Sequence, residues 1–357
     1  MQQPYPWQQA AWQAQQQRIA AGRLPHALLL CGPAGLGKLD FAHLLARSLL
    51  CEQPAPLPAA SAHGGGDQEP LRGATAIAGL PCGSCRGCQL LDAGTHPDFH
   101  AVQPEEEGKE ITIGQIRELL TWQTLTPQYG RARIVIIEPA DRMNANAANA
   151  LLKTLEEPGR DALLLLVSAR PAALLPTIRS RCQLLPFVAQ WGTEAQAWLS
   201  ERLGDAAQAE LALAISGGTP LRALTLVETG GMERRERLFA DFAAMLDGSR
   251  DPVALAAQWL ELPVQDTLAT LHGWCVDMAR LQAGAADGRL DNPDLRQRLQ
   301  ALCERVDLAQ LLHRQAQLQE AMRLARGHPN VQLLLEELLL GWSGMGGTAA
   351  RRAAPTR

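Results

Sequence analysis

The stretch that decides the fold is CGPAGLGKLDFA, residues 31–42. It fits the phosphate-binding pattern G-x-x-x-x-G-K-[ST] except at Leu39, which stands where the pattern requires Ser or Thr. In such a loop, backbone N–H groups at a helix N-terminus hold the phosphates, and the lysine adds a positive charge. The missing hydroxyl is the group that binds Mg²⁺. We therefore predict a degenerate P-loop that keeps its backbone cradle and lacks the metal ligand, built from Gly32, Gly35, Gly37 and Lys38.

The sequence on either side supplies the context that a P-loop requires. HALLLCG at 26–32 predicts a buried strand that feeds the loop, and KLDFAHLLARSLLC after it predicts a helix. Further apolar runs at 132–141 and 161–170 predict two more strands, with a helical pattern between them. Strands that alternate with helices indicate a mostly parallel sheet covered on both faces.

The second predicted strand ends in an acidic position. A P-loop site usually has a carboxylate at the end of a neighbouring strand, and here the strand ends in Glu138 followed by Pro139. Glu138 can take the metal-side position, whereas Pro139 supplies no base for the attacking water. The alternative is a buried strand with a turn and no role at the site. At the end of the third strand, Ser168 and Ala169 are equal candidates for a polar sensing position.

Composition excludes several classes of function. The chain has 357 residues, a formal net charge of -4 and a pI of about 6.1, so no global basic field points to nucleic acid as the main partner. No apolar run reaches the ~18 residues of a membrane span. The first residues lack the basic and apolar regions of a signal peptide, so we expect a cytoplasmic location and no membrane partner.

Three of the eight cysteines form a tight cluster. Cys82, Cys85 and Cys88 have the spacing C-x₂-C-x₂-C, which can present three thiolates to one tetrahedral Zn²⁺. A fourth ligand must come from elsewhere, and His63 and His96 are candidates beside a fourth cysteine. The Pro-, Ala- and Gly-rich segment 52–81 has no useful period and is predicted to be a flexible insert.

The second half of the chain is helical. From about residue 190 the strand signals stop, and three short helical patterns are followed from about residue 232 by longer ones. The last residues, 344–357, have nothing to bury and are predicted to be disordered.

Four motifs in this order resemble those of bacterial clamp-loader subunits of the AAA+ class: the P-loop, the strand at 133–137, NALLKTLEEP at 149–158 and SRC at 180–182. The resemblance covers residues 5–190 most strongly. It implies an α/β AAA+ fold with a RecA-like P-loop domain and parallel sheet, a small helical lid and an all-α collar. The implied boundaries are 1–189 with a zinc-binding module at about 51–100, 190–231 for the lid, 232–343 for the collar and 344–357 for the tail.

The same resemblance implies a function and two residue roles. Members of this family form five-membered rings that open the sliding clamp and place it on primed DNA. The partners it implies are the motor and delta subunits of the ring, together with the clamp and DNA. The arginine of the SRC motif reaches a neighbour's ATP, which assigns an arginine finger in trans to Arg181. Cys51 matches the first zinc cysteine of the family, so the implied structural zinc has Cys51, Cys82, Cys85 and Cys88 as ligands.

Three functions remain open on the sequence. The first is a clamp-loader subunit of the DNA polymerase III holoenzyme that hydrolyses ATP poorly, is not catalytic alone, and assists its neighbour. The second is a motor subunit that binds and hydrolyses ATP through residues 32–38, which the retained Lys38 favours. The third is a zinc-stabilised nucleic-acid binding module, which the absence of a basic stripe disfavours.

Overall fold

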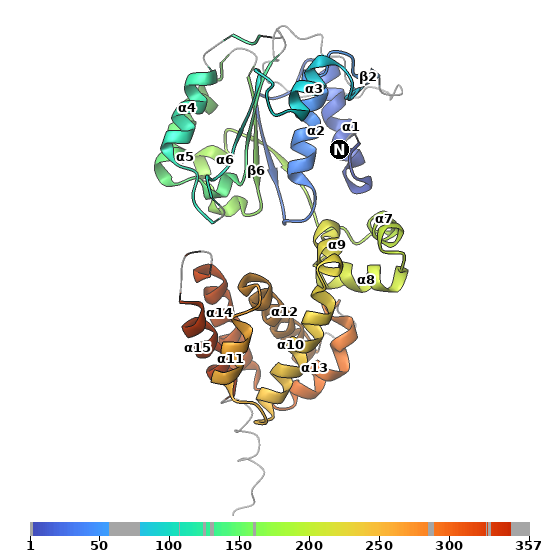
Figure 1. Ribbon diagram of the computed structural model, residues 1–357, viewed down its shortest axis with the longest axis vertical. Helices are drawn as coiled ribbons and strands as arrows, with labels where there is room; N and C mark the ends of the chain where they lie inside the picture. Colours follow the sequence, from blue (N-terminus) through green and yellow to red (C-terminus); the bar gives the residue numbers. More distant parts are fainter. Residues whose placement is uncertain are drawn as a thin grey trace, which may run out of the picture. The chain divides into compact units, whose positions relative to one another are not determined.

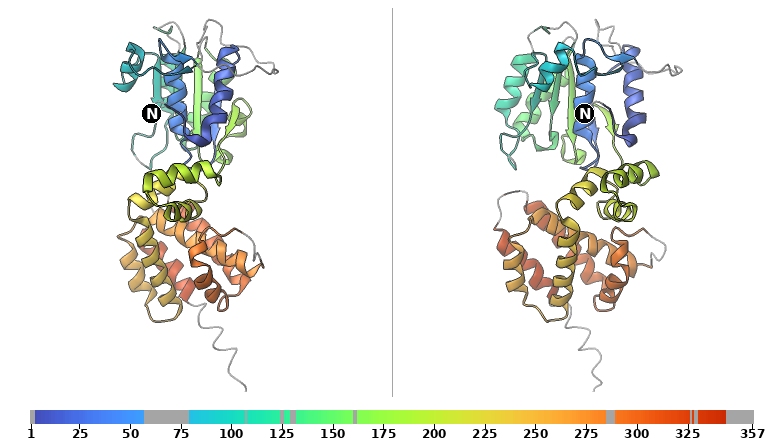
Figure 2. Two further views of the ribbon diagram at one scale, coloured as in Figure 1. Left: turned by 90° about the vertical axis from the view of Figure 1, so that its right-hand side faces the viewer. Right: turned by 45° about the vertical axis from the view of Figure 1, so that its right-hand side comes forward.

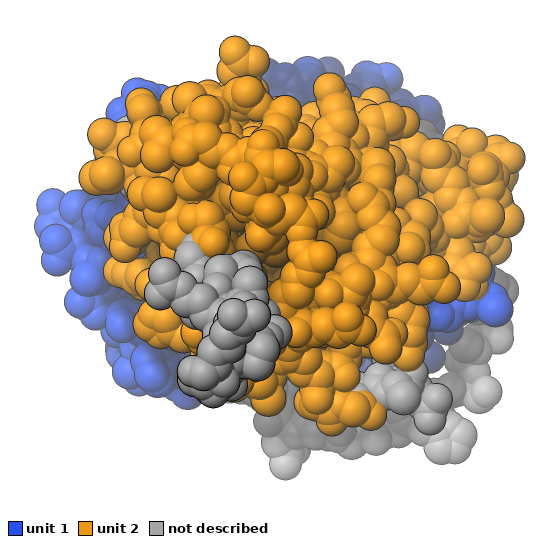
Figure 3. Space-filling model, turned by 90° about the horizontal axis from the view of Figure 1, so that it is seen from below, with its two compact units in different colours: residues 1–195 blue, residues 196–357 orange. Residues whose placement is uncertain are grey.

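The protein is described here from a computed structural model, which defines residues 3–56, 79–106, 108–123, 126–128, 132–159, 162–284, 289–325, 327 and 330–343. It divides into two compact units, residues 1–195 and 196–357, which Figure 3 distinguishes by colour. Most of the predicted insert, including His63, and the predicted disordered tail lie outside the described residues. The finer division of the second unit into lid and collar stays a prediction.

The first unit is built on a parallel sheet of five strands in the order β4-β5-β6-β1-β7. The predicted α/β fold of AAA+ type is confirmed, and the three apolar runs form its three central strands. The two edge strands were not predicted, because each is four residues long and only partly buried. The strands are β1 (Ala27–Cys31), β4 (Phe99–Val102), β5 (Arg133–Ile137), β6 (Ala162–Ser168) and β7 (Gln183–Pro186).

Helices cover both faces of this sheet (Figure 1). Because successive side chains of a strand point to opposite faces, Leu28 and Leu30 pack with α1 and α2, whereas Leu29 packs with α4 and α5. Two-sided burial explains why the central strands read as continuous apolar runs. The helices are α1 (Gln9–Ala20), α2 (Lys38–Leu50), α3 (Arg86–Asp92), α4 (Ile113–Gln123), α5 (Ala145–Glu156) and α6 (Pro176–Arg179), with short 3₁₀ turns η1 (Pro6–Gln8), η2 (Ala140–Arg142) and η3 (Pro171–Ala173).

The two ends of the predicted insert lie within the described residues. There, β2 (Ala55–Pro56) and β3 (Gly79–Leu80) pair as a small antiparallel ladder, which the sequence did not predict. The short α3 follows and lies beside α2 (Figure 1). The segment that carries the cysteine cluster is therefore attached to the P-loop helix.

All five strands run in the same direction, so the first unit has one side where the strands end and an opposite side where they begin. These two sides, called edges from here on, are not the edge strands β4 and β7, and they differ chemically. All strands end at one edge, so the loop after β1, Glu138 after β5 and Ser168 at the end of β6 gather there. The opposite edge holds the start of β7 and the end of α5, because α5 runs from the end of β5 back to the start of β6. The contact between His26 Nε2, just before β1, and the carbonyl of Leu155, 3.1 Å away, lies at this second edge.

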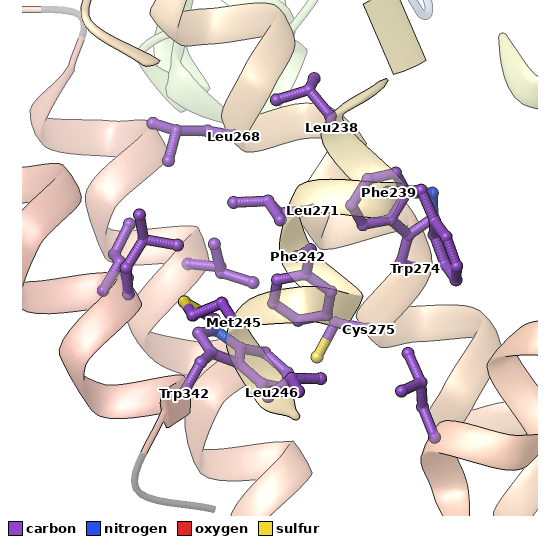
Figure 4. Packing of buried hydrophobic residues seen from close by; sticks show 14 of the residues in the cluster. Leu238, Phe239, Phe242, Met245, Leu246, Leu268, Leu271, Trp274, Cys275 and Trp342 are labelled. Carbon is purple, nitrogen blue, oxygen red and sulfur yellow. The ribbon is translucent and has the colours of Figure 1, made fainter. Parts of the chain in front are cut away.

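The second unit consists of helices in its described part (Figure 2). Its core centres on four aromatic side chains, Phe239, Phe242, Trp274 and Trp342, which contact one another edge-on or tilted (Figure 4). The helices are α7 (Thr193–Leu203), which spans the boundary, α8 (Ala206–Ile215), α9 (Pro220–Glu228), α10 (Gly231–Leu246), α11 (Pro252–Trp259), α12 (Val264–Gln282), α13 (Arg296–Cys303), α14 (Leu308–Leu324) and α15 (Val331–Ser343), with the 3₁₀ turn η4 (Pro293–Leu295). Among the described helices, none combines the length and apolar character needed to cross a membrane.

Candidate functional site

The predicted P-loop lies between β1 and α2, and its glycines are required by the backbone. Gly32, Gly35 and Gly37 have φ angles of 143°, 83° and 74°, which residues with a Cβ rarely adopt. A Cβ at Gly32 would also lie 1.9 Å from the carbonyl oxygen of Phe187. The loop leads directly into α2, whose first residue is Lys38, so the helix N-terminus and its free N–H groups are in place for an anion.

Lys38 is folded back onto its own loop. Its Nζ donates a hydrogen bond to the carbonyl oxygen of Pro33 at 2.7 Å, and the residue is 6% exposed. Burial lowers the pKa of Lys38, while the nearby carboxylates of Asp141 and Glu138 oppose that shift. The ammonium group of Lys38 is therefore hydrogen-bonded within the protein, although the residue stands at the lysine position of the P-loop pattern.

A segment near the N-terminus covers the carbonyl groups of the loop, a contact that no sequence pattern predicted. Gln8 Nε2 donates to the carbonyl oxygens of Leu36 at 2.8 Å and of Gly37 at 2.9 Å. Trp7 Nε1 donates to the same Leu36 oxygen at 3.2 Å, and Tyr5 stacks on Trp7 with 4.8 Å between ring centroids. These contacts join the segment before α1 to the backbone of the loop.

An apolar side chain stands at the position where the P-loop pattern has its hydroxyl. Leu39, in the place of the missing hydroxyl, packs against the apolar cluster between the sheet and α1 and α2. Glu138 follows directly after β5, and burial raises the pKa of its carboxyl group, with Lys38 acting in the opposite direction. Nothing in these contacts supplies a hydroxyl at the Mg²⁺ position.

The buried carboxylate at this edge is Asp141, which the sequence analysis missed. Its Oδ1 accepts hydrogen bonds from Ser168 Oγ at 2.8 Å and from the N–H of Ala169 at 3.2 Å, and its Oδ2 accepts one from Arg170 Nε at 3.0 Å. Its side chain is 3% exposed. Asp141 thus ties the end of β6 to the turn after β5. Ser168, one of two candidates for a sensing position, is engaged in this network.

Arg181 lies at the other edge of the sheet, two residues before β7. Its Nη2 is 2.5 Å from Glu156 Oε1, and its Nη1 donates to the carbonyl oxygen of Thr177 at 3.0 Å. Glu156 comes from the TLEEP motif, so two motifs that are separate in sequence meet here. The Arg181 side chain is 34% exposed. Because the strands of the sheet separate it from Lys38, Arg181 does not belong to the P-loop of its own chain.

The four cysteines of the predicted metal site come together. The sulfur atoms of Cys51, Cys82, Cys85 and Cys88 all lie within 4.8 Å of one another, and those of Cys51 and Cys85 are 3.8 Å apart. Four thiolates about 2.3 Å from one tetrahedral Zn²⁺ would be about 3.8 Å apart. The predicted fourth cysteine therefore joins the group. His96 is not part of it, and His63 lies outside the described residues.

The surroundings of the sulfurs suit a thiolate–metal centre. Backbone N–H groups point at three of them, from Cys82 to Cys51 Sγ at 3.3 Å, from Cys85 to Cys82 Sγ at 3.3 Å and from Cys88 to Cys85 Sγ at 3.4 Å. The backbone N–H groups of Ser84 and Cys85 lower the pKa of Cys82 to about 6, whereas burial raises the pKa of Cys51 and Cys88. Ionising all four thiols together requires a compensating cation, and the four donors fit Zn²⁺.

The fold and these sites define a class, a P-loop α/β protein of AAA+ type joined to a helical region. A family model described as "DNA polymerase III, delta subunit" matches residues 7–63 and 71–190, and one described as "DNA polymerase III, delta subunit, C terminal" matches residues 230–344.

Two delta' subunits from other bacteria agree with these matches. The chain is 37% identical to the DNA polymerase III subunit delta' of Pseudomonas aeruginosa over 96% of this chain and 98% of the relative. It is 31% identical to the subunit delta' of Escherichia coli over 94% of each. A solved DNA polymerase III gamma subunit-related protein from Thermotoga maritima aligns over 94% of this chain and 99% of its own, with 18% identity and a TM-score of 0.43. The chain belongs to the family of DNA polymerase III delta' subunits.

Proposed function

We propose that this chain is a cytoplasmic clamp-loader subunit of the DNA polymerase III holoenzyme. In this proposal it joins motor and delta subunits in a five-membered ring that loads the sliding clamp onto primed DNA. The family membership supports this proposal, since the similarity to delta' subunits extends over nearly the whole chain. The division into a P-loop domain, a lid at 190–231 and a collar at 232–343 belongs to the same proposal.

In this role the chain does not hydrolyse ATP efficiently by itself. Mg²⁺ holds the β- and γ-phosphates of ATP in P-loop hydrolases, and the hydroxyl that helps bind it is replaced by the packed side chain of Leu39. Pro139 stands where a base would follow the acidic residue, and Asp141 is occupied by Ser168 and Arg170. The losses at the loop and at the strand end support the same conclusion.

The chemical contribution that we propose is Arg181, acting on the ATP of a neighbouring subunit. The observation that carries this is its position, at the sheet edge opposite the P-loop and partly exposed. A guanidinium is permanently charged and planar, so it can stabilise the charge that spreads over a transferring phosphoryl group. Glu156 holds the side chain in the free subunit and can orient it toward the neighbour.

The test is ATP turnover by the isolated chain, by the reconstituted complex, and by complexes that contain Arg181→Ala or Arg179→Ala. We expect negligible turnover alone. In the Arg181→Ala complex, the neighbouring site should lose about 10³-fold or more in rate, the effect of such arginines in other nucleotide hydrolases. Arg179→Ala is the matched control, an exposed arginine two residues away at the end of α6, and should leave turnover unchanged.

Two outcomes would contradict the proposal. Robust hydrolysis by the isolated chain would favour the alternative function, an ATP-hydrolysing motor subunit, which the retained Lys38 and the glycine geometry of the loop support. Equal turnover in the two mutant complexes would exclude Arg181 as the arginine finger. Assembly of each complex is checked by gel filtration, so that a lost contact is not mistaken for lost chemistry.

We also propose that Cys51, Cys82, Cys85 and Cys88 hold one structural zinc. Four cysteines leave no open coordination position, so the metal would stabilise the segment and take no part in catalysis. The distances between the sulfurs and the N–H groups that point at them support this assignment.

A further inference from the structure

A long stretch of sequence separates Cys51 from the other three cysteines of the site. Cys51 directly follows α2, whereas the other three cysteines follow residues 57–78. On the two sides of this gap, β2 and β3 pair through Ala55 with Leu80 and Pro56 with Gly79, and the N–H of Gly87 donates to Glu52 Oε1 at 3.1 Å. An isolated two-stranded ladder is marginal in water even when it is longer. A further contact, at Gly79, joins the chain after the gap to α1 and α2.

That contact consists of hydrogen bonds between the buried side chains of Gln16 and Ser48 and the backbone of Gly79, called the Gly79 grip from here on. Its N–H donates to Gln16 Oε1 at 2.7 Å, and its carbonyl oxygen accepts a hydrogen bond from Ser48 Oγ at 2.6 Å. Gln16 Nε2 in turn donates to Ser48 Oγ at 3.3 Å, which closes the network. Gln16 is 0% exposed and Ser48 2% exposed. A buried polar group without a hydrogen-bond partner costs free energy. A shift of the chain at Gly79 would leave Gln16 and Ser48 without these partners, so the network favours one register.

Gly79 fits this grip because it has no side chain. A Cβ there would lie 1.9 Å from the carbonyl oxygen of Ala55, so the two chain segments approach as closely as backbone allows. The grip also sets the register of the cysteines. Three residues after Ser48 comes Cys51, three residues after Gly79 comes Cys82, and the N–H of Cys82 donates to Cys51 Sγ at 3.3 Å.

We infer that Gln16 and Ser48 are positioning residues of the four-cysteine site, which hold the chain at Gly79 so that Cys82 reaches Cys51 across the insert. The inference rests on the proposed zinc. It adds that the geometry of the site is prepared by α1 and α2 before metal binds, because no thiol takes part in the grip. Residues that orient metal ligands from outside the coordination shell commonly change metal affinity about 10- to 100-fold when they are replaced.

The experiment measures zinc affinity of the full-length chain by competition with a chromophoric chelator. Co²⁺ spectra report whether four-thiolate coordination is kept. Gln16→Met keeps the size of the side chain and removes its hydrogen bonds, and we expect zinc binding about 10- to 100-fold weaker. Ser48→Ala should weaken it in the same direction. The double variant should lose less than the product of the two single losses, because both act on one backbone position.

Two controls bracket the result. Gln15→Met replaces the neighbouring glutamine of α1, which is equally buried and donates nothing to Gly79, and should leave zinc affinity unchanged. Cys85→Ser should lose the metal. If Gln16→Met fails to fold, as judged by circular dichroism, the milder Ser48→Ala decides.

The outcomes separate the inference from the zinc proposal. A wild-type chain that binds no zinc overturns both. A wild-type chain with one zinc, and Gln16→Met and Ser48→Ala variants that bind it equally well, overturns the positioning role alone. A lower thermal midpoint with unchanged zinc affinity also overturns it, because that result would describe a purely structural role.

Discussion

At the scale of single residues, Lys38 is the P-loop residue whose position matches the phosphate-binding pattern but whose side chain is bonded within its own loop. It stands at the P-loop lysine position, yet its ammonium is buried against the carbonyl oxygen of Pro33. Burial of a charge without a closely paired carboxylate costs free energy, which is consistent with the lowered pKa of this group.

Replacement of Lys38 by Met tests whether the lysine serves a ligand. If it does not, Lys38→Met should raise the free energy of unfolding by about 0 to 1 kcal/mol, measured by urea titration, and should leave turnover of the complex unchanged. The sign with pH follows from the lowered pKa. Holding the charge penalises the folded state fully at neutral pH, and the penalty fades as pH rises toward the unfolded value near 10.4. The advantage of the variant should therefore shrink in alkaline solution.

The exposed Lys153 provides the control, since Lys153→Met should change stability by less than about 0.5 kcal/mol at any pH. A destabilised Lys38→Met chain would show that the hydrogen bond to Pro33 outweighs the cost of burying the charge, and a complex with lower turnover would show that the lysine serves a nucleotide.

At the scale of elements, the sequence predicted what rests on local pattern and missed what rests on contacts. Strands β1, β5 and β6 are continuous apolar runs, whereas the short edge strands β4 and β7 are partly exposed and carry no comparable signal. Glycine spacing predicted the loop, and cysteine spacing predicted three of the clustered thiols. The roles of Asp141 and Gln8 depend on partners 27 and 28 residues or more away, which a pattern cannot identify.

The β2–β3 ladder makes a prediction about the insert. Replacement of residues 57–78 by a four-residue Gly- and Ser-containing turn should leave zinc affinity within about threefold, because the ladder and the contacts to Gly79 lie outside the replaced segment. Shortening the connection should also raise the free energy of unfolding by about 1 kcal/mol. Zinc affinity and urea titration measure both. Loss of zinc would instead assign a ligand within the insert and would favour His63.

At the scale of the whole molecule, the two units have separate cores. Trp12 lies in the apolar cluster of the first unit, and Trp274 lies among the aromatic side chains of the second. Trp274→Ala should destabilise the second unit by about 3 to 5 kcal/mol and leave zinc content unchanged. Trp12→Ala is the matched variant for the first unit. Calorimetry should resolve two transitions, each lowered by its own variant; a common shift of both would indicate one cooperative unit.

The placement of the P-loop and Arg181 at opposite edges of one sheet has a consequence for how such a subunit tolerates mutation. Substitutions around Leu39 or Pro139 affect the nucleotide site of this chain, whereas substitutions of Arg181 or Glu156 affect the arginine that we propose acts on the ATP of a neighbouring subunit. Distant sites without shared partners are generally independent in their effects. If Arg181 acts as proposed, the P-loop can accumulate substitutions while selection for the neighbour's activity retains Arg181. A subunit that does not hydrolyse ATP can then persist in a working ring.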